Sequence, residues 1–394
     1  MADKIIYADH AATTPVDSRV LDVMLPFLAK NYYNPSALYS QARSVRASIE
    51  KVRSLVLDFI GAVPAGQLIF TGSGTESVNL ALYSAVSREN TAGGSKKGRI
   101  IVSAAEHHAV LNCAASLAEK FAIEQVPVDR YGIVLPETLK KLMGPDVCLV
   151  SIMSVNNETG AINDTISLCK IAHDGGARFH TDAVQALGVF PLRAKEMGAD
   201  YISISAHKIY GPKGIGAMYA APGIPIVPMI RGGKQEGDFR AGTENTAGIA
   251  GFGCAVDILN GQLDKDFAHL AGLRKIFLEG IANISDLMIN SPPDGAPSSE
   301  AVPSSFAVPG IINISAAGVE AEHCLLRLSM AGVLASMGAA CNAATVDPSH
   351  VVEAIGVPAA YKRGTLRFSF GRENTTDDAA LAAQELAKAI EKTR

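Results

Sequence analysis

The sequence predicts an α/β protein with a large, mainly parallel sheet and a second, smaller α+β domain. From about residue 15 to 260, short apolar runs of strand length alternate with longer amphipathic runs of helical period. Strands that alternate with helices are typical of a parallel sheet covered by helices on both faces. The 394 residues are also enough for two or three domains.

Each predicted strand is a short apolar run that ends at polar or glycine positions. The six strands are Leu68–Thr71, Arg99–Ser103, Val147–Ser154, Ala177–Thr181, Tyr201–Ser205 and Gly216–Ala220. Amphipathic patterns predict helices at Thr75–Val86, Ala109–Phe121, Ile166–Asp174 and, near the end of the chain, Asp377–Lys392.

The expected large domain covers residues 15–260, and residues 1–14 with 261–394 form the expected small domain. Residues 11–15 read as a turn between the two rather than as part of a core. Residues 291–310 are rich in Pro and Ser, which indicates a loop within the small domain.

Charge and composition exclude several classes of protein. The 35 basic and 39 acidic residues give a net charge of −4, so no positive excess attracts nucleic acid or an anionic membrane. The long uncharged stretches, 214–230 and 301–319, are broken by Gly and Pro, and the first ten residues lack the apolar core of a signal peptide. The six cysteines are too sparse for a disulfide framework and form no CxxC pair. We expect a cytoplasmic protein without a metal.

Polar clusters follow the predicted strands, where ligands bind in open α/β sheets. Residues 71–77, TGSGTES, follow a strand and open a helix. Glycines let the backbone approach an anion, and the free N–H groups of a helix start can bind phosphate. The spacing is not that of a nucleotide P-loop. A tight strand-to-helix turn without a ligand explains this segment about equally well.

Two further clusters are residues 105–108, AEHH, and 155–160, VNNETG. A single histidine is more often structural than functional, and Asn and Gly dominate ordinary turns. Taken alone, neither cluster identifies a site.

Asp182 and Lys208 are stronger candidates. Asp182 ends an otherwise apolar strand, so its carboxylate needs a cationic partner or a shifted pKa, although a helix cap is a good alternative. Lys208 follows the next strand and precedes a rigid Gly-Pro turn. A lysine there is usually solvated, but a desolvated amine is a nucleophile suited to an aldehyde.

Together these clusters fit one cofactor. Pyridoxal phosphate needs a lysine for its aldehyde, an anion beside its pyridine nitrogen, a cup for its phosphate and a flat group against its ring. The combination is far more specific than any one of its parts.

The sequence resembles cysteine desulfurases of the NifS/IscS type, which are fold type I pyridoxal phosphate enzymes related to class V aminotransferases. The resemblance extends over nearly the whole chain, from residues 9–15 to 364–372. Its most specific motifs are NNETG at 156–160, HTDAVQ at 180–185, SAHKIYGPKG at 205–214 and RGGKQEGDFRAGTEN at 231–245.

The resemblance implies that Lys208 carries the cofactor, that Asp182 pairs with the pyridine nitrogen and that His107 stacks on the ring. It assigns Asn157 and Gln185 to the phenolic oxygen. The implied phosphate ligands are Gly74, Thr75, Ser205, His207 and, from the partner subunit of a homodimer, Thr243. The implied substrate contacts are Arg367, whose fork suits the carboxylate of L-cysteine, and Asn34. Lys208 or His107 would move the proton of the substrate.

The resemblance also implies that Cys341 is the thiol that takes the sulfur of L-cysteine as a persulfide while alanine is released. An iron–sulfur scaffold or a thiolation acceptor would then receive the sulfur. The small residues around Cys341, in SMGAACNAAT at 336–345, suit a flexible loop, although a buried structural cysteine is the alternative. The family commonly has Ser-Gly-Ser-Ala before this cysteine, where this chain has Met337-Gly-Ala-Ala.

Two other hypotheses keep the same fold but assign the protein a different function. One is a C–S or C–Se lyase, or an aminotransferase, that forms no protein persulfide, because one fold can host several reactions. Another is a non-catalytic assembly subunit, against which the presence of Lys208, Asp182 and Arg367 argues.

Overall fold

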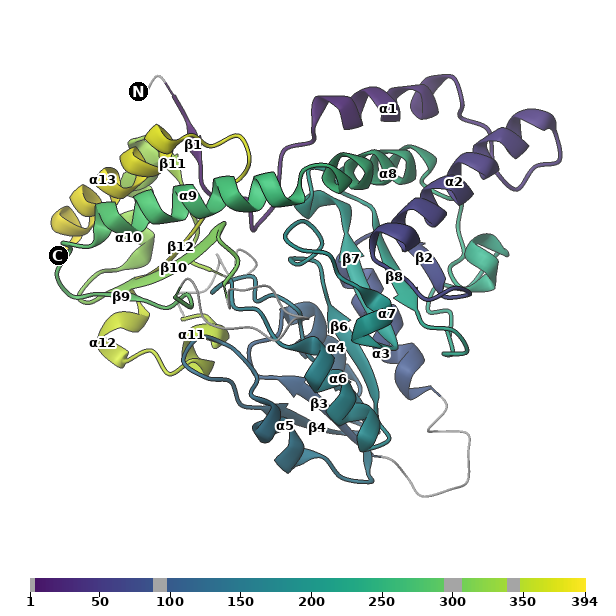
Figure 1. Cartoon of the computed structure of the whole chain (residues 1–394), viewed down its shortest axis with the longest axis horizontal. Coiled ribbons are helices and arrows are strands. Elements are labelled where there is room, and N and C mark those ends of the chain that lie inside the picture. The colour runs from purple at the N-terminus through teal and green to yellow at the C-terminus, as the bar shows by residue number, and fades with distance from the viewer. Residues whose placement is uncertain (1–3, 88–97, 294–306, 339–347) are drawn as a thin grey trace.

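The computed structural model describes residues 4–87, 98–293, 307–338 and 348–394 (Figure 1). Its largest sheet has seven strands in the order β2-β8-β7-β6-β5-β3-β4. The bounds are β2 Gln67–Thr71, β3 Arg99–Ser103, β4 Ala122–Val126, β5 Val147–Ser151, β6 Arg178–Asp182, β7 Tyr201–Ser205 and β8 Gly216–Ala220. Strand β8 runs antiparallel to both of its neighbours, and the other pairs are parallel. The predicted α/β class and mainly parallel sheet are confirmed.

Helices cover both faces of this sheet. One layer contains α2 (Ser40–Phe59), α6 (Thr165–Asp174) and α8 (Thr246–Asn260), and the other contains α3 (Gly74–Val86) and α4 (His108–Ser116). Alternate residues of a strand serve the two layers: Ile101 packs with the first core, whereas Ile100 and Val102 pack with the second. This is the period of two that a sheet buried on both faces requires.

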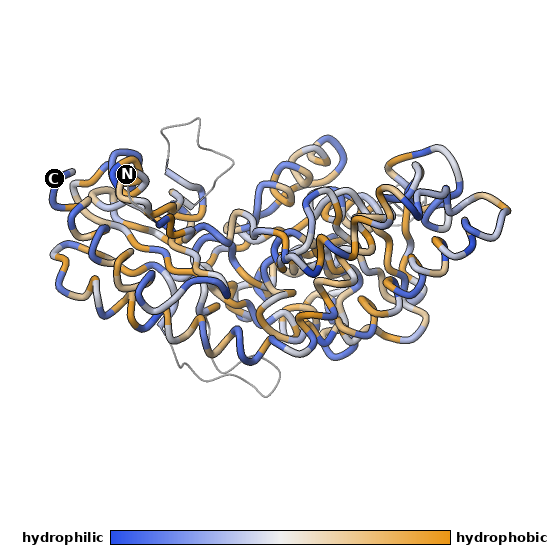
Figure 2. Tube along the Cα trace, turned by 90° about the horizontal axis from the view of Figure 1, so that it is seen from above, coloured by the Kyte–Doolittle hydropathy of each residue, from blue (hydrophilic) through white to orange (hydrophobic). Residues whose placement is uncertain are grey.

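This part of the chain also contains several other helical elements. They are α1 (Ser18–Ala29), α5 (Pro136–Leu142) and α7 (Ala194–Met197), together with the single turns η1 (Ala206–Lys208) and η2 (Gln235–Asp238). Helix α1 packs against α8. Figure 2 shows hydrophobic and hydrophilic residues alternating along the outer helices, as amphipathic helices require.

A second core lies beside the large sheet. Its three antiparallel strands are β9 (Leu287–Ile289), β10 (Ile311–Ala316) and β12 (Thr365–Ser369), with β10 in the middle. Helices α9 (Leu263–Ile281), α10 (Ala321–Met330) and α13 (Thr376–Thr393) contribute to this core, and Phe277 of α9 packs against Phe368. Near the start of the chain, β1 (Ile6–Tyr7) pairs in parallel with β11 (Val333–Leu334). Two short helices, α11 (His350–Ala354) and α12 (Ala359–Lys362), precede β12.

The structure differs from the predicted elements in several places, and the strands of the second core were not predicted at all. Strand β4 was not predicted, because its sequence AIEQV is polar and mostly outside the core at the edge of the sheet. The helix predicted to Phe121 ends at Ser116, and residues 117–120 form turns. Strand β5 ends at Ser151, three residues before the predicted end, although the N–H groups of Ile152 and Ser154 still donate hydrogen bonds to carbonyl oxygens of β6.

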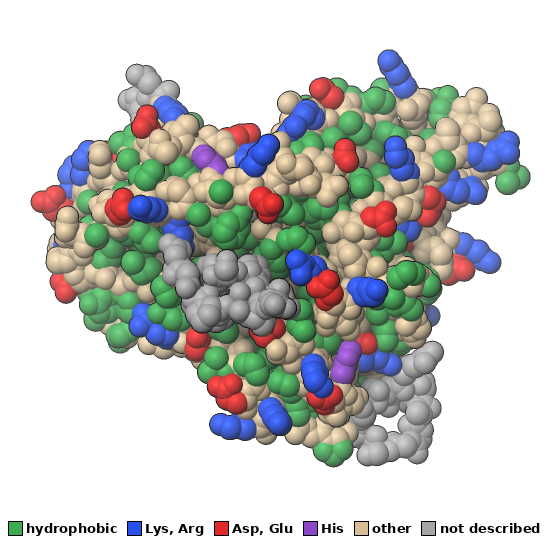
Figure 3. All heavy atoms as spheres, in the orientation of Figure 1, with side chains coloured by type: hydrophobic (Ala, Val, Ile, Leu, Met, Phe, Trp, Pro, Cys, Tyr) green, Lys and Arg blue, Asp and Glu red, His purple; other side chains and the backbone are tan. Residues whose placement is uncertain are grey.

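The topology brings the predicted polar clusters to one edge. Strands β2, β3, β5, β6 and β7 run in the same direction, so their carboxyl ends meet at the side that faces β10 and β12. Over the described ranges, no helix has the length and apolar character needed to cross a membrane. Figure 3 shows basic and acidic side chains interspersed over the visible face.

Candidate active site

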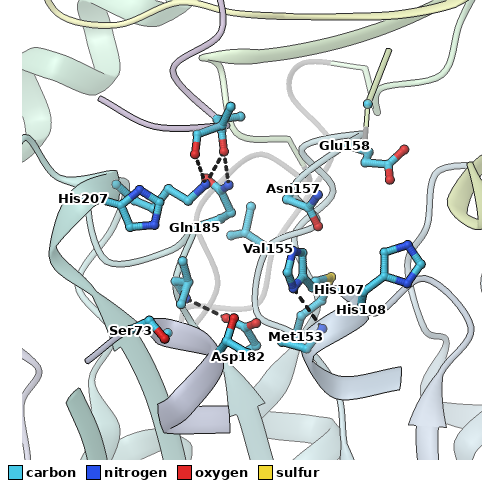
Figure 4. Close-up of a pocket in the computed structure, with 18 of the residues that line it drawn as sticks. Ser73, His107, His108, Met153, Val155, Asn157, Glu158, Asp182, Gln185 and His207 are labelled. Carbon is cyan, nitrogen blue, oxygen red and sulfur yellow. Dashed lines mark hydrogen bonds between the residues drawn. The ribbon is translucent and has the colours of Figure 1, made fainter. Parts of the chain in front are cut away.

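A cavity of about 250 Å³ opens at the carboxyl ends of the parallel strands. Residues from all the predicted clusters line it, and so does one strand of the second core (Figure 4). The predicted site residues among its walls are Gly74, Thr75, His107, Asn157, Asp182, Gln185, His207, Lys208 and Arg367. The structure therefore brings together groups that lie up to about 290 residues apart in the chain.

The start of α3 forms one end of the cavity. Ser73 caps the helix, because its Oγ accepts a hydrogen bond from the Glu76 N–H at 3.1 Å. A methyl group on Gly74 would lie only 2.8 Å from Cγ2 of Val184 and 3.4 Å from Cβ of the buried Ser205. Glycine at position 74 therefore allows the backbone to approach β7 more closely than a residue with a side chain could. Free N–H groups at the start of a 13-residue helix favour an anion such as phosphate.

Asp182 lies at the base of the cavity, below His107 and Gln185 in Figure 4. The side chain is buried, and its Oδ1 accepts a hydrogen bond from the Val184 N–H at 2.9 Å. Burial raises the pKa of this carboxyl to about 6, although the Val184 N–H and the charge of Lys208 both oppose the rise. A carboxylate held in such surroundings suits a protonated ring nitrogen, whose charge would compensate its own.

This burial predicts that Asp182 destabilises the cofactor-free protein. The folded-state pKa lies above the unfolded value, so stability is lost as the pH rises from about 4 through 6. Cofactor-free Asp182→Asn should therefore unfold at higher denaturant than wild type at pH 8, by about 2–3 kcal/mol, with the gap closing near pH 4. Urea titrations of both proteins at the two pH values measure this. Equal stabilities at pH 8 would contradict the assigned burial cost.

His107 and Asn157 lie on the wall beside Asp182 (Figure 4). His107 caps α4: its Nδ1 accepts a hydrogen bond from the Ala109 N–H at 3.1 Å, which leaves the ring proton on Nε2. Burial and the charge of Lys208 lower the pKa of His107 to about 4, so the ring is neutral at pH 7. Asn157 has a buried Oδ1 without a hydrogen-bond partner in the described structure, a group that a ligand can satisfy.

Lys208 ends the turn η1 directly after β7. Its Nζ donates hydrogen bonds to the carbonyl oxygens of Ala11 and Ala12, the latter at 2.8 Å. Gln185 Nε2 donates to the same Ala11 carbonyl at 2.9 Å. The amine therefore lies in the cavity against the first turn of the chain. Its charge also helps burial to lower the pKa of His207 to about 4.

Arg367, on β12, is a buried cation in the wall opposite the large sheet. Its Nη1 donates to the Asn157 carbonyl and its Nη2 to Oδ1 of Asp9, both at 2.8 Å. The buried Nε has no hydrogen-bond partner in the described structure. The guanidinium is thus fixed on two sides and retains donors for an anionic group.

The structure leaves several predicted residues away from the cavity walls. Thr243 lines a separate hollow with Gly72 and Arg240, and Asn34 is exposed in the turn between α1 and α2. Ser205 lies buried beneath Gly74. Cys341 falls outside the described residues.

The structure adds groups in the cavity wall and behind it that the sequence did not single out. Asp9 orients Arg367, and His108 and His350 stand with ring centroids 4.6 Å apart. Glu158 is buried, and burial raises its pKa to about 7 against the opposing effects of Ser349 and Arg367. Glu106, behind His107, is fully buried, and burial raises its pKa far above the usual range. These residues lie inside the polar clusters or the segments that match the family, which for His350 is DPSHV at 347–351, and this position was the available signal.

Comparison with known proteins places this geometry in a family. The family model "Aminotransferase class-V" matches residues 6–381. The chain is 42% identical to a protein of Dictyoglomus turgidum named cysteine desulfurase IscS, over 99% of this chain and 95% of that protein. It is 34% identical to cysteine desulfurase NifS of Azotobacter vinelandii, over 100% of this chain and 94% of that protein.

Solved structures agree with the sequence relatives. A structure titled NifS-like protein superposes with a TM-score of 0.88 at 31% identity, over 98% of this chain and 100% of that one. A structure titled SspA in complex with cysteine gives a TM-score of 0.78 at 31% identity, over 94% of this chain and 100% of that one. The chain therefore belongs to the class V aminotransferase family and, within it, to the pyridoxal phosphate-dependent cysteine desulfurases of the IscS and NifS type.

Proposed function

We propose that this protein converts L-cysteine to L-alanine and keeps the sulfur as a persulfide on Cys341. The observation that carries the proposal is the meeting of Asp182, Lys208 and Arg367 in one cavity. These three groups supply an anion for a ring nitrogen, an amine for an aldehyde and a cation for a substrate carboxylate.

The residues of the cavity fit pyridoxal phosphate. Asp182 would hold the ring nitrogen, the start of α3 would hold the phosphate, and the orphaned Oδ1 of Asn157 marks an unsatisfied polar position on the wall. When bound, the cofactor supplies an electron sink for bonds at the α-carbon of the substrate. Lys208 would hold the cofactor covalently, with Ser205 and His207 supporting the phosphate side.

The chain's own groups then account for binding and proton transfer. The Nε and remaining Nη hydrogens of Arg367 would bind the substrate carboxylate, with the guanidinium held by Asp9 and the Asn157 carbonyl. Lys208 would move the α-proton, and the neutral His107 ring would stack on the cofactor. Gln185, bound to the Ala11 carbonyl beside Lys208, would reach the phenolic oxygen.

The proposed sulfur transfer conserves atoms and electrons without an external oxidant. The Cys341 thiolate attacks the sulfur of the substrate, an S–S bond forms, and the C–S bond breaks with its electron pair leaving on carbon. That carbon gains a proton to give alanine, so L-cysteine and a thiol become L-alanine and a persulfide. The sulfur is oxidised by the amount that the carbon is reduced.

A product assay tests this proposal. Holoenzyme supplied with L-cysteine and an added thiol reductant should release alanine and sulfide in equal amounts. Pyruvate with ammonia would instead identify a lyase, and transfer of the amino group to a keto acid would identify an aminotransferase.

We also propose a homodimer in which Thr243 of the partner subunit completes the phosphate site. Large apolar side chains are exposed on α1 and in the turn after it: Leu21, Leu25, Leu28, Tyr32 and Leu38. Such a patch is typical of an interface. The position of Thr243 outside the cavity of its own chain also fits a contribution to the neighbouring one.

Leu28→Asp should dissociate this dimer, because a charge would be buried in the apolar interface. Analytical ultracentrifugation of wild type and variant measures the change. Leu326→Asp, at a similarly exposed leucine on α10, is the matched control and should stay dimeric. A monomeric wild type, or a Leu28→Asp protein as dimeric as the control, would overturn the proposed interface.

We further propose that the protein works in the cytoplasm and passes its sulfur to an iron–sulfur scaffold or a thiolation acceptor. The sparse cysteines of the sequence suit a reducing compartment, where a persulfide donor keeps its thiol. A pull-down with the persulfide-loaded enzyme, followed by detection of sulfur on the captured protein, tests the acceptor.

A further inference from the structure

Glu158 is a buried carboxylate to which the proposed chemistry gives no role. It lines the cavity on the same wall as Asn157, His107 and His108 (Figure 4). Its side chain is only 1% exposed, and its Oε2 has no hydrogen-bond partner in the described structure. Burying a carboxylate is costly, so a retained one calls for an explanation.

The carboxylate lies against two points that are close in sequence to Cys341. Ser349 Oγ donates a hydrogen bond to Oε1 at 2.8 Å. On the other side, a methyl group on Gly338 would lie only 2.6 Å from Oε2, and the positive φ of +104° at Gly338 also favours glycine. Gly338 precedes Cys341 by three residues, and Ser349 follows it by eight. Glu158 therefore accepts a hydrogen bond from Ser349 on one side of the thiol and leaves no room for a side chain at Gly338 on the other.

Both contact points are fixed to the rest of the molecule. Before Gly338, the backbone of Ser336 exchanges hydrogen bonds with Arg367, at 2.7 and 3.1 Å. After it, Ser349 caps α11 by accepting from the Val351 N–H, and His350 Nε2 lies 2.8 Å from the Glu106 carbonyl. Val351 and Val352 of α11 pack with Ala105 at the end of β3. Glu158 lies where these two anchored stretches meet.

We propose that Glu158 is a positioning residue for sulfur transfer, which accepts the hydrogen bond of Ser349 and packs closely against Gly338 at the cavity wall, and so sets the approach of Cys341 to the substrate. This inference rests on the proposed desulfurase function. In this role the length of the Glu158 side chain matters, because it places one carboxylate between Ser349 and Gly338. A proton-transfer role would instead depend on its charge.

Two conservative variants distinguish the effect of the length of the Glu158 side chain from the effect of its charge. Glu158→Gln keeps the length and an oxygen for Ser349 but loses the charge, whereas Glu158→Asp keeps the charge and is one methylene shorter. Misplacement of a reacting group by about 1 Å can cost about 10²-fold in rate. We expect single-turnover persulfide formation on Cys341 to slow by about that factor in Glu158→Asp and to stay within about twofold of wild type in Glu158→Gln.

The experiment follows two signals in the same holoenzyme. The change in cofactor absorbance on adding L-cysteine reports substrate arrival, and mass spectrometry of the Cys341 peptide reports the persulfide. Glu158→Asp should leave the first signal and the KM for L-cysteine unchanged and slow only the second. Ser349→Ala, which removes the hydroxyl partner alone, should act in the same direction. Glu119→Gln, at an exposed glutamate, is the control and should leave both signals unchanged.

A slow Glu158→Gln beside a normal Glu158→Asp would overturn the inference in favour of a role for the charge. Normal persulfide formation in both Glu158→Asp and Ser349→Ala would also overturn it. Neither outcome affects the proposed function, which fails only if the wild-type protein forms no alanine and no persulfide. If Glu158→Asp does not fold, the comparison of Ser349→Ala with wild type decides.

Discussion

Lys208→Ala is expected to lower the turnover of L-cysteine by about 10⁴-fold or more, to the level of the assay background. The variant loses the amine that would hold the cofactor and move the α-proton. In the structure this amine lies within the cavity, bound to the Ala11 and Ala12 carbonyls. The start of α3 and Asp182 remain, so the variant should still bind pyridoxal phosphate weakly. Alanine release and cofactor absorbance measure the two effects.

Lys213→Ala provides the matched control, because this lysine lies five residues further along the same loop and is exposed. It should bind the cofactor and turn over L-cysteine as wild type does. Normal turnover by Lys208→Ala, in a protein that melts at the wild-type temperature, would remove Lys208 from the proposed chemistry.

Arg367→Lys is expected to raise the KM for L-cysteine by about 10- to 100-fold, with a smaller effect on kcat. The change keeps the positive charge but loses the guanidinium fork, so one ammonium must replace the contacts to Asp9, the Asn157 carbonyl and the substrate. A hydrogen bond between charged groups contributes about 1.5–3 kcal/mol, which corresponds to this change in KM. Steady-state kinetics over a range of L-cysteine concentrations measures it.

Arg363→Lys is the control for this change. Arg363 is an exposed residue just before β12 that pairs with Glu320 outside the cavity. Its KM should equal that of wild type. An unchanged KM in Arg367→Lys would show that the substrate carboxylate binds elsewhere.

The fold was largely predictable because its signals are local. Strands buried on both faces, such as β7, are continuous apolar runs, and the polar residues directly after them lie at their carboxyl ends. Strand β4 lacked this signal, because an edge strand can remain polar and half exposed. The sheet order, which brings β5 next to β3, depends on long-range pairing that no short sequence pattern contains.

The candidate site was predictable where a residue's chemistry is specific, as for Lys208 and Asp182. Glu158 and Asp9 were harder to identify, because each acts on a distant partner. Glu158 meets Ser349, 191 residues away, and Asp9 meets Arg367, 358 residues away. Their positions within recognised motifs mark them, but only the folded chain shows what they contact.

The most direct test of the account is to mix the holoenzyme with L-cysteine without reductant, quench the reaction, and quantify alanine together with the persulfide on the Cys341 peptide. We expect one alanine for each persulfide formed, with the sulfur on Cys341, and neither product at the wild-type rate from Cys341→Ala. Alanine release without a persulfide on Cys341, or pyruvate and ammonia in place of alanine, would contradict the account.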